Sequence, residues 1–348
     1  MSLDFLDEYD FPLDESQIAK YPAKERDESK LLVLKRQSST ITKHKNFREI
    51  TSYLRSGDVL VYNETKVSKR RVFLETKSGR KHESIFLESR DPEGLEWLCI
   101  LKNRKKLKLG ESIWPIGETE ISFSYTEAKE ELSLLHSSKK ITEEDFEKWG
   151  KIPIPPYLKR EATEDDEERY QTIFAKNLGS VAAPTAGLHF TNELKEQLLN
   201  IGVQFVPINL EIGYGTFQPL SEAQVVEKKL HKEKYFVSLE SAELLTLARR
   251  EGRRIISIGT TSLRVLETIY ENHSQLFVAG QGETDIFVSP GDEIHSIDGL
   301  VTNFHLPRSS LLLLVSTFAG KELIMKSYHH ALDNGFRFYS YGDTMFVL

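Results

Sequence analysis

The sequence predicts an α/β domain that carries an inserted antiparallel β-barrel. Two observations predict this fold. Short β-rich segments separated by turns follow one another from about residue 66 to residue 137, and after residue 170 the pattern alternates between strands and helices. Because the β-rich block lies between two α/β parts, we expect a discontinuous α/β domain of residues 1–65 and 151–348 with an inserted barrel of residues 66–150. A sandwich is the alternative to the barrel.

The first half of the chain yields one clear strand before the barrel. Residues 59–62 read as a buried strand that follows a Ser-Gly-Asp turn. The proline-rich residues 151–157 predict an extended connector, and the acidic residues 161–169 predict either a mobile loop or the start of a solvated helix. The barrel strands are expected at residues 72–76, 84–88, 97–101, 120–125 and 131–136.

The second half of the chain has the periodicities of an α/β domain. Strands are expected at residues 203–210 and 254–258, and a final strand at residues 336–348. Helices are expected from about Asn192 and at residues 239–251, 261–270 and 310–332.

Composition sets the class of protein. The 348 residues, 39% of them hydrophobic, can build two globular domains, and Cys99 is the single cysteine, which excludes a disulfide framework and a cysteine-based zinc site. The acidic N-terminal segment is not a signal peptide, and the longest apolar run, residues 311–315, is too short to span a bilayer. We therefore expect a cytoplasmic protein that does not contact membranes.

The distribution of charge along the chain is compatible with a local contact to nucleic acid. The net charge of −7 argues against bulk attraction to nucleic acid. Two basic clusters nevertheless lie in or beside the β-rich block, and they could bind phosphates, although a solvated hairpin is the usual explanation for such a cluster. They are Lys66, Lys69, Arg70 and Arg71, and Lys102, Arg104, Lys105, Lys106 and Lys108.

One stretch is unusually dense in directional hydrogen-bonding groups. Residues 302–310 contain an amide, an imidazole, a guanidinium and three hydroxyls, and they stop at the apolar residues 311–315. Ser309 or Ser310 can cap the helix that begins there, and the N-terminus of that helix favours an anion. The stretch is either a capped helix start with an incidental histidine or a binding loop.

Further polar junctions point to a composite pocket. Each is rich in Gly, Thr or Ser and lies where a strand meets a loop or helix; they are residues 183–191, 211–217, 259–264, 282–285 and 341–343. Turn and cap chemistry explains any one of them, but five in one domain predict a pocket for a polar small molecule at the strand ends. The sequence lacks the motifs of nicotinamide enzymes, NTPases, zinc hydrolases and serine hydrolases.

The histidines differ in their surroundings. A single histidine such as His231 is more often structural or exposed than catalytic. His189 and His305 lie inside dense polar motifs, which makes them candidates for general acid–base chemistry. No histidine spacing indicates a metal site.

Taken together, the junctions resemble one family, the S-adenosylmethionine:tRNA ribosyltransferase-isomerases of queuosine biosynthesis. The resemblance runs nearly from end to end, and it rests on residues 17–23, 57–63, 182–191, 259–264, 284–287, 302–308 and 338–343. Four positions depart from the family pattern. Glu211 stands where a histidine is usual, Tyr214 replaces a small residue, and Glu64 and Lys66 replace residues of the same charge.

The resemblance implies an α/β catalytic domain with an inserted β-barrel and an unusual reaction. Such enzymes transfer and isomerise the ribosyl group of S-adenosylmethionine onto 7-aminomethyl-7-deazaguanine at the wobble position of tRNA. Epoxyqueuosine forms, and adenine and methionine leave. The implied partners are the modified tRNA and S-adenosylmethionine, which is a consumed co-substrate; no metal or other cofactor is implied, and we expect a monomer.

Roles for individual residues follow from this chemistry as hypotheses. His189 and His305 are the candidate acid–base residues, with Asp285 and Asp343 as alternatives. Thr260, Thr261, Ser262 and Asn303 would hold the ribose or adenine, and Arg264 and Arg308 a methionine carboxylate or an RNA phosphate. The expected binding set is completed by Thr185, Gly187, Gly213, Gly215, Thr216 and Tyr341. The rival hypotheses are a conventional methyltransferase and a catalytically inactive RNA-binding module.

Overall fold

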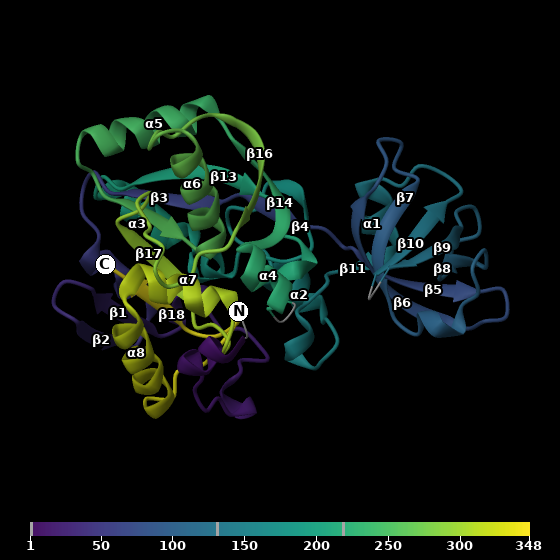
Figure 1. Ribbon diagram of the computed structural model, residues 1–348, viewed down its shortest axis with the longest axis horizontal. Helices are drawn as coiled ribbons and strands as arrows, with labels where there is room; N and C mark the ends of the chain where they lie inside the picture. Colours follow the sequence, from purple (N-terminus) through teal and green to yellow (C-terminus); the bar gives the residue numbers. More distant parts are fainter. Residues whose placement is uncertain (1–2, 130–131, 218–219) are drawn as a thin grey trace.

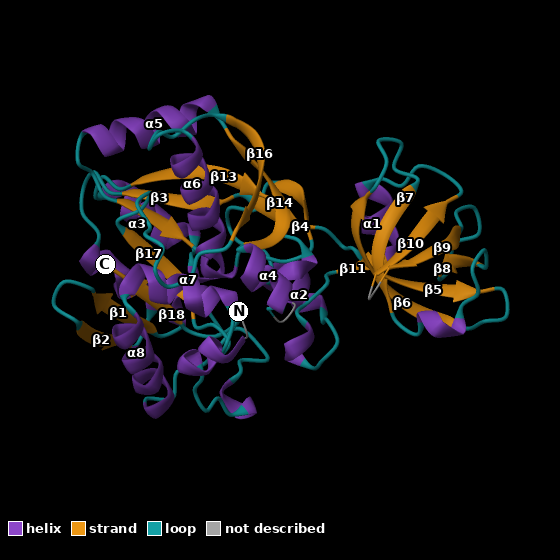
Figure 2. Ribbon diagram, viewed as in Figure 1, coloured by secondary structure: helices purple, strands orange, loops and turns teal. Residues whose placement is uncertain are grey.

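The computed structural model describes residues 3–129, 132–217 and 220–348, and it confirms the predicted fold class. A large α/β domain holds both ends of the chain, and a smaller β-barrel lies to one side of it (Figure 1). Figure 2 shows that helices surround the sheet of the large domain, whereas the barrel consists mostly of strands. None of the helices in the described ranges is both long and apolar enough to cross a membrane.

A nine-stranded mixed sheet forms the centre of the large domain. Its four central strands, β13, β3, β15 and β17, run parallel. The strands on either side of them, β14 and β18, are antiparallel to this group; β16 pairs antiparallel with β14, β1 pairs parallel with β18, and β2 pairs antiparallel with β1. In spatial order the strands are β16 (Gly280–Ile286), β14 (Lys229–Val237), β13 (Gln204–Leu210), β3 (Val59–Asn63), β15 (Ile255–Ile258), β17 (Gly299–Asn303), β18 (Thr344–Val347), β1 (Leu31–Lys35) and β2 (Thr40–His44).

Apolar cores lie on both faces of this sheet, because successive side chains of a strand point to opposite faces. On one face, Val59 and Val61 of β3 belong to a core shared with four helices, and on the other Leu60 joins a smaller core. The four helices are α5 (Leu239–Arg250), α6 (Thr260–Asn272), α7 (Ser310–Ala319) and α8 (Lys321–Asp333); the smaller core includes α3 (Asn192–Asn200) and the 3-10 helix Phe47–Tyr53.

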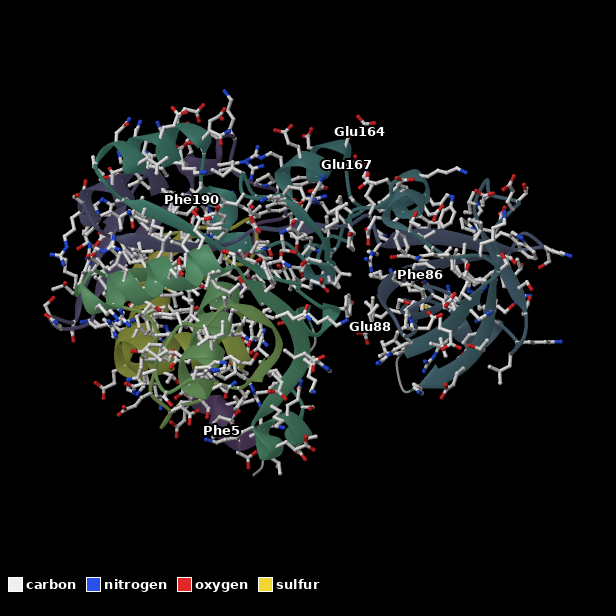
Figure 3. All side chains as sticks on the ribbon, turned by 90° about the horizontal axis from the view of Figure 1, so that it is seen from above. Phe5, Phe86, Glu88, Glu164, Glu167 and Phe190 are labelled. Atoms are coloured by element: carbon white, nitrogen blue, oxygen red, sulfur yellow. The ribbon has the colours of Figure 1, made fainter. Side chains whose placement is uncertain are left out.

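Six strands close the barrel, which settles the choice between barrel and sandwich. The chain pairs β5-β6-β7-β10-β9-β8, and β8 returns to pair with β5. Phe86, Trp97, Phe123 and Phe146 pack inside it with ring centroids 5.0–6.0 Å apart, and Figure 3 shows Phe86 within this separate body. The elements are β5 (Arg71–Thr76), β6 (Lys81–Ser89), β7 (Glu96–Leu101), β8 (Ser112–Pro115), β9 (Phe123–Lys129), β10 (Leu132–Ser137) and helix α1 (Glu143–Trp149).

The two segments that join the barrel to the large domain lie side by side. On entry, β4 (Thr65–Val67) pairs with β12 (Asn177–Ser180) of the large domain. On exit, β11 (Gly150–Lys151) pairs with β5. A Cβ atom on Gly150 would lie 1.7 Å from the carbonyl oxygen of Lys69, so only glycine permits this approach. The barrel's own strands thus extend from residue 71 to residue 151, against the predicted insertion at 66–150.

Two predicted elements of the C-terminal part are wrong in extent. The helix expected at residues 310–332 is two helices, because Gly320, with φ of 90°, breaks it between α7 and α8. Of the strand expected at residues 336–348, only β18 is strand, and residues 336–343 form a loop before it.

Other predicted elements differ less. The strand expected at residues 120–125 begins at Phe123, and β10 begins at Leu132, since Glu131 lies outside the described residues. In the acidic segment, residues 164–169 form the short helix α2 (Glu164–Arg169). The helix α4 (Glu222–Glu227) and several 3-10 helices complete the fold; the latter are Leu3–Tyr9, Glu15–Gln17, Arg26–Glu28, Arg104–Lys106, Pro156–Leu158, Thr185–His189 and Tyr214–Phe217.

Candidate active site

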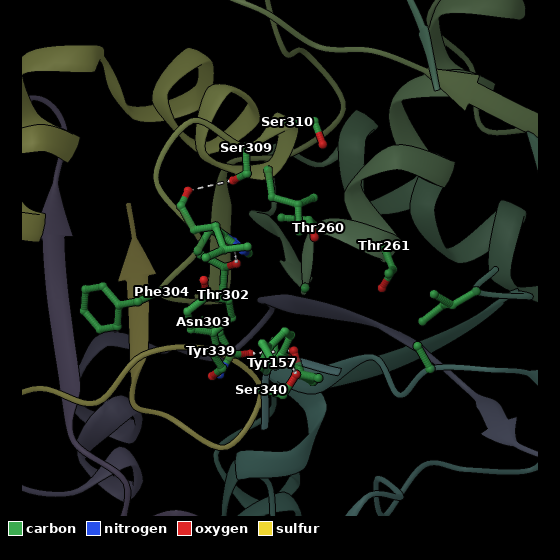
Figure 4. Close-up of a pocket in the computed structure, with 18 of the residues that line it drawn as sticks. Tyr157, Thr260, Thr261, Thr302, Asn303, Phe304, Ser309, Ser310, Tyr339 and Ser340 are labelled. Atoms are coloured by element: carbon green, nitrogen blue, oxygen red, sulfur yellow. Dashed lines mark hydrogen bonds between the residues drawn. The ribbon is translucent and has the colours of Figure 1, made fainter. Parts of the chain in front are cut away.

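A cavity of about 500 Å³ lies where the parallel strands β15 and β17 end. After β15 come Gly259, Thr260 and Thr261, and after β17 comes the loop that leads to Ser309 and α7. Because both strands run in the same direction, their carboxyl ends meet at one edge of the sheet. Figure 4 shows the threonines of the first junction across the cavity from Thr302 and Asn303. The strand-end prediction of a composite pocket therefore agrees with the fold.

The first junction supplies the N-terminus of α6. Gly259 has φ of 89°, a conformation that favours glycine, and it turns the chain from the strand into the helix. Thr260 and Thr261 then occupy the first helical positions and line the cavity. Among the described residues the buried Oγ1 of Thr261 has no hydrogen-bond partner. The helix start thus presents a hydroxyl and free backbone N–H groups to a ligand.

The second junction is the stretch 302–310, which both caps a helix and lines the cavity. Ser309 is the N-cap of α7, and its Oγ accepts a hydrogen bond of 3.2 Å from the backbone N–H of Leu312. Arg308 has φ of 57° and its exposed guanidinium forms an ion pair of 2.8 Å with Asp7. The predicted capping role is confirmed for Ser309, and it coexists with a place in the cavity wall.

His305 lines the cavity and is held at both its backbone and its ring. Its backbone N–H donates to the hydroxyl of Tyr328 at 2.9 Å, and its Nε2 lies 2.8 Å from Oγ1 of Thr302. Burial lowers the pKa of His305 from 6.5 to about 3, so the ring is neutral at neutral pH. In the tautomer in which Nε2–H donates to Thr302, Nδ1 keeps a lone pair that can accept a proton.

His189 does not line the main cavity, and both its ring nitrogens are engaged. Nδ1 lies 2.7 Å from the hydroxyl of Ser29, and Nε2 accepts a hydrogen bond of 2.9 Å from the amide of Asn303. The other side of that amide accepts a hydrogen bond of 2.9 Å from Thr185. Burial, and then the charges of Arg337 and Arg26, lower the pKa of His189 to about 3.

Neither predicted carboxylate faces the cavity. Asp343 is buried and accepts hydrogen bonds from the backbone N–H groups of Lys30 and Arg337, at 2.9 Å and 2.8 Å, so it fixes the loop before β18. Asp285 lies on β16 and has Lys229 as an ion-pair partner at 3.8 Å. The geometry therefore gives these two aspartates structural contacts and no access to a ligand in the cavity.

Several other members of the predicted binding set support the walls from behind. Gly187 packs against Thr172, Ser262 donates to the carbonyl of Ile258, and Tyr341 donates to Asp166 at 2.6 Å. The structure thus divides the set. Thr185, Thr260, Thr261, Asn303, His305 and Arg308 line the cavity; His189, Gly187, Ser262, Asp285, Tyr341 and Asp343 do not. The side chain of Thr216 lies outside the described residues.

A small side pocket of about 50 Å³ adjoins the main cavity and shares Thr260, Thr261 and Ser310 with it. Arg264 of α6 lines this pocket, and its Nη1 forms a buried ion pair of 2.5 Å with Glu233. The second oxygen of Glu233 accepts a hydrogen bond of 2.9 Å from the backbone N–H of Gly213. Gly215 and His231 also line the side pocket.

Sequence reasoning missed the aromatic wall of the cavity. Tyr157 and Tyr339 have ring centroids 4.4 Å apart, and the hydroxyl of Tyr157 is hydrogen-bonded to that of Ser340. Tyr170 completes this wall. Tyr339 and Ser340 belong to a segment already singled out by its motif, whereas Tyr157 is the last residue of the proline-rich connector. No local pattern distinguishes Tyr157 from a residue in an extended spacer.

The two basic clusters behave differently. In the first, Lys69, Arg70 and Arg71 have Glu167, Glu143 and Glu83 as ion-pair partners. In the second, Lys102 has Glu83 as a partner, while Lys105, Lys106 and Lys108 lie exposed on one barrel loop. The second cluster is therefore the basic surface that remains available to an anionic partner.

Two further observations bear on the chemistry. Within the described ranges no group of three or more His, Cys, Asp or Glu side chains is arranged to hold a metal ion. Glu211 lies exposed beside Gly179 and outside the cavity wall, so its departure from the family pattern does not alter that wall.

The fold and the cavity define a two-domain α/β protein with a small-molecule site at its strand ends. The model of the queuosine biosynthesis protein family matches residues 6–347, and the chain belongs to this family.

Named relatives are similar over the full length. Proteins named S-adenosylmethionine:tRNA ribosyltransferase-isomerase from Staphylococcus epidermidis and Staphylococcus saprophyticus are 42% and 43% identical over 347 residues, which is 99% of this chain and of theirs. One from Pelobacter propionicus is 42% identical over 98% of both chains. The crystal structure of S-adenosylmethionine tRNA ribosyltransferase from Thermotoga maritima is 32% identical, covers 98% of this chain and 100% of that one, and has a TM-score of 0.55.

Proposed function

We propose that this chain is an S-adenosylmethionine-dependent tRNA ribosyltransferase-isomerase of queuosine biosynthesis. It transfers and isomerises the ribosyl group of S-adenosylmethionine onto 7-aminomethyl-7-deazaguanine at the wobble position of tRNA, and it releases adenine and methionine. The observation that carries this proposal is the convergence of the junctions at Thr185, Thr260 and residues 302–310 on one cavity. The full-length relatives supply the reaction class.

The cavity suits the co-substrate in size and in polarity. A volume of about 500 Å³ is within the range of sites that enclose small organic ligands. Threonine hydroxyls and the Asn303 amide offer hydrogen bonds to a ribose or adenine, and Tyr157 and Tyr339 offer aromatic faces to a base. The modified guanine and adenine are both flat rings, so an aromatic wall can hold either one.

The reaction moves protons at defined atoms. The sulfonium acidifies the 5′ carbon of the ribose, a base takes one of its protons, and adenine leaves with the electron pair of its glycosidic bond and gains a proton. The amine of the modified base then forms a bond to the ribosyl group and loses a proton. The ribose ring opens between C1′ and its oxygen, and the ylide carbon C5′ forms the C1′–C5′ bond that closes the carbocycle. The freed oxygen on C4′ then attacks C5′ and closes the epoxide, and methionine leaves with the electron pair of the carbon–sulfur bond.

We assign the first proton transfer to His305 and a positioning role to His189. His305 lines the cavity and is neutral at neutral pH, so it can accept a proton, and the burial that lowers its pKa also makes it a weaker base than an exposed histidine. His189 instead orients Asn303 through Nε2. We further propose that the reaction needs no metal or redox cofactor, and that the enzyme acts as a monomer in the cytoplasm, where its tRNA substrate is found.

One incubation tests the proposed function. The protein, S-adenosylmethionine and tRNA carrying the modified wobble base are combined, and free adenine, methionine and the mass of the tRNA nucleoside are measured. Adenine and methionine in equal amounts, with epoxyqueuosine in the tRNA, are expected. S-adenosylhomocysteine would instead identify a methyltransferase, and tRNA binding without either product would identify an RNA-binding module.

A further inference from the structure

Among the described residues, one side of the Arg264 guanidinium has no hydrogen-bond partner. The side chain is buried, with 6% of it exposed, and Nη1 alone is engaged, by Glu233. Within the described part of the chain, Nε and Nη2 have no hydrogen-bond partner. Buried polar groups in folded proteins almost always have partners, so two unpaired donors on one buried cation indicate a missing acceptor.

The two unpaired nitrogens are the ones that bind a carboxylate best. Nε–H and one Nη2–H of a guanidinium point in the same direction and make two parallel hydrogen bonds to the oxygens of a carboxylate. Thr261 adds a third unpaired polar atom, its Oγ1, at the start of the 13-residue helix α6, whose N-terminus favours negative charge. Arg264 and Thr261 both line the side pocket.

The same pocket carries a fixed negative charge. Glu233 is 6% exposed and lines the side pocket next to Arg264. A buried positive group beside a buried negative group is complementary to a zwitterion such as an α-amino acid.

We propose that the side pocket is the receptor for the amino-acid end of S-adenosylmethionine, with Arg264 binding its carboxylate. This inference rests on the proposed function. The side pocket shares Thr260, Thr261 and Ser310 with the main cavity, so a single ligand can extend from one into the other. At about 50 Å³ the side pocket admits a small charged group and excludes a nucleoside.

Arg308, the other arginine at the cavity, is poorly suited to this role. Its side chain is 47% exposed and has Asp7 as an ion-pair partner at 2.8 Å. Water and Asp7 therefore compete with a ligand carboxylate for its donors. Arg308 serves as the control for Arg264, since it carries the same group but lines the main cavity and not the side pocket.

The test compares two ligands on the full-length protein by titration calorimetry. The probes are S-adenosylmethionine and its decarboxylated analogue, which lacks the carboxylate and keeps the amine. We expect the wild type to bind S-adenosylmethionine about 10- to 100-fold more tightly than the analogue. Arg264→Gln brings this ratio close to one, Arg264→Lys gives an intermediate ratio because it keeps charge without the two-bond geometry, and Arg308→Gln keeps the wild-type ratio.

Each other outcome overturns the assignment. The carboxylate binds elsewhere if the wild type binds both ligands equally tightly. The same conclusion follows if both Arg264 variants keep the wild-type ratio of affinities, or if only Arg308→Gln loses it. If Arg264→Gln fails to fold, the affinity ratios of the wild type and Arg264→Lys still decide whether Arg264 binds the carboxylate. If the wild type releases adenine but binds the two ligands equally tightly, the subsite proposal is wrong and the proposed function stands. If the wild type neither binds S-adenosylmethionine nor releases adenine, both proposals are wrong.

Discussion

The side-chain amide of Asn303 donates a 2.9 Å hydrogen bond to Nε2 of His189, at the end of a strand that opens into the cavity. This contact places the ring proton of neutral His189 on Nδ1, where it can donate to Ser29. Thr185 holds the oxygen of the same amide. Asn303 is thus fixed from two sides, and its orientation is set by a histidine that lies outside the cavity.

The first prediction separates positioning from proton transfer. His189→Ala removes the 2.9 Å acceptor of the Asn303 amide and leaves it the longer hydrogen bond of 3.2 Å to the carbonyl of Tyr339, so we expect the KM for S-adenosylmethionine to rise about 5- to 100-fold. His189→Gln, which can still accept from the amide, should recover most of this loss. The pH profile of kcat should be the same in both variants and the wild type. A change in that profile would make His189 a proton-transfer group.

The second prediction concerns His305. Replacement by Gln removes the proposed base, and adenine release should fall about 10²- to 10⁴-fold. Thr302→Val is the companion variant, because it removes the partner of Nε2 while keeping the imidazole; a smaller loss is expected. Single-turnover adenine release and circular dichroism measure activity and folding. Near-wild-type release by folded His305→Gln rules out the assignment.

The third prediction is a pH dependence of stability. The pKa of His189 is about 3 in the folded chain against an ordinary 6.5. Above pH 6.5 neither state binds the proton. Between pH 6.5 and 3 the unfolded state alone binds it, so the free energy of unfolding falls by about 1.4 kcal/mol per pH unit. Urea unfolding at several pH values should show a shallower decline in His189→Gln than in the wild type; equal slopes contradict the prediction.

The fourth prediction concerns the exposed barrel loop. Replacing Lys105, Lys106 and Lys108 by Ala should weaken tRNA binding and reduce the slope of log Kd against log salt by up to about one for each phosphate that the loop no longer neutralises. Lys139 and Lys140, exposed on another part of the barrel, form the control pair, whose replacement should change the slope little. Filter binding at several salt concentrations measures this. An unchanged slope in the triple variant excludes the loop from the RNA interface.

Local patterns predicted the architecture better than the limits of its elements. The alternation of strands and helices fixed the fold class, because burial periodicity is a property of each segment. The break at Gly320 was missed because the apolar pattern continues through it, and the left-handed turn there depends on how α7 and α8 pack. Strands β14 and β16 were missed too, since they form the exposed edge of the sheet.

For the site, too, the sequence predicted some residues, and only the tertiary structure placed the others. The strand predicted at residues 254–258 put Thr260 at a strand end, whereas Asn303 was predicted from the dense polar stretch 302–310, and both line the cavity. His189 and His305 were equivalent in sequence, each a histidine in a dense polar motif. What separates them is that His305 lines the cavity, whereas His189 does not and contacts the Asn303 amide, and only tertiary structure decides that. Tyr157 reaches the cavity from the connector, again through tertiary packing.

The chain enters and leaves the barrel at two adjacent segments, near Lys69 and Gly150, and this insertion affects the order in which the two domains fold. Strand β3 leaves the ribosome before the barrel does, yet its neighbours β13 and β15 are synthesised only after it. The barrel pairs strands that are close in sequence, so it can fold during this interval. The apolar strand β3 therefore stays without its partners β13 and β15 while the adjacent barrel is already folded. We expect the nascent chain to be most prone to aggregation at this stage.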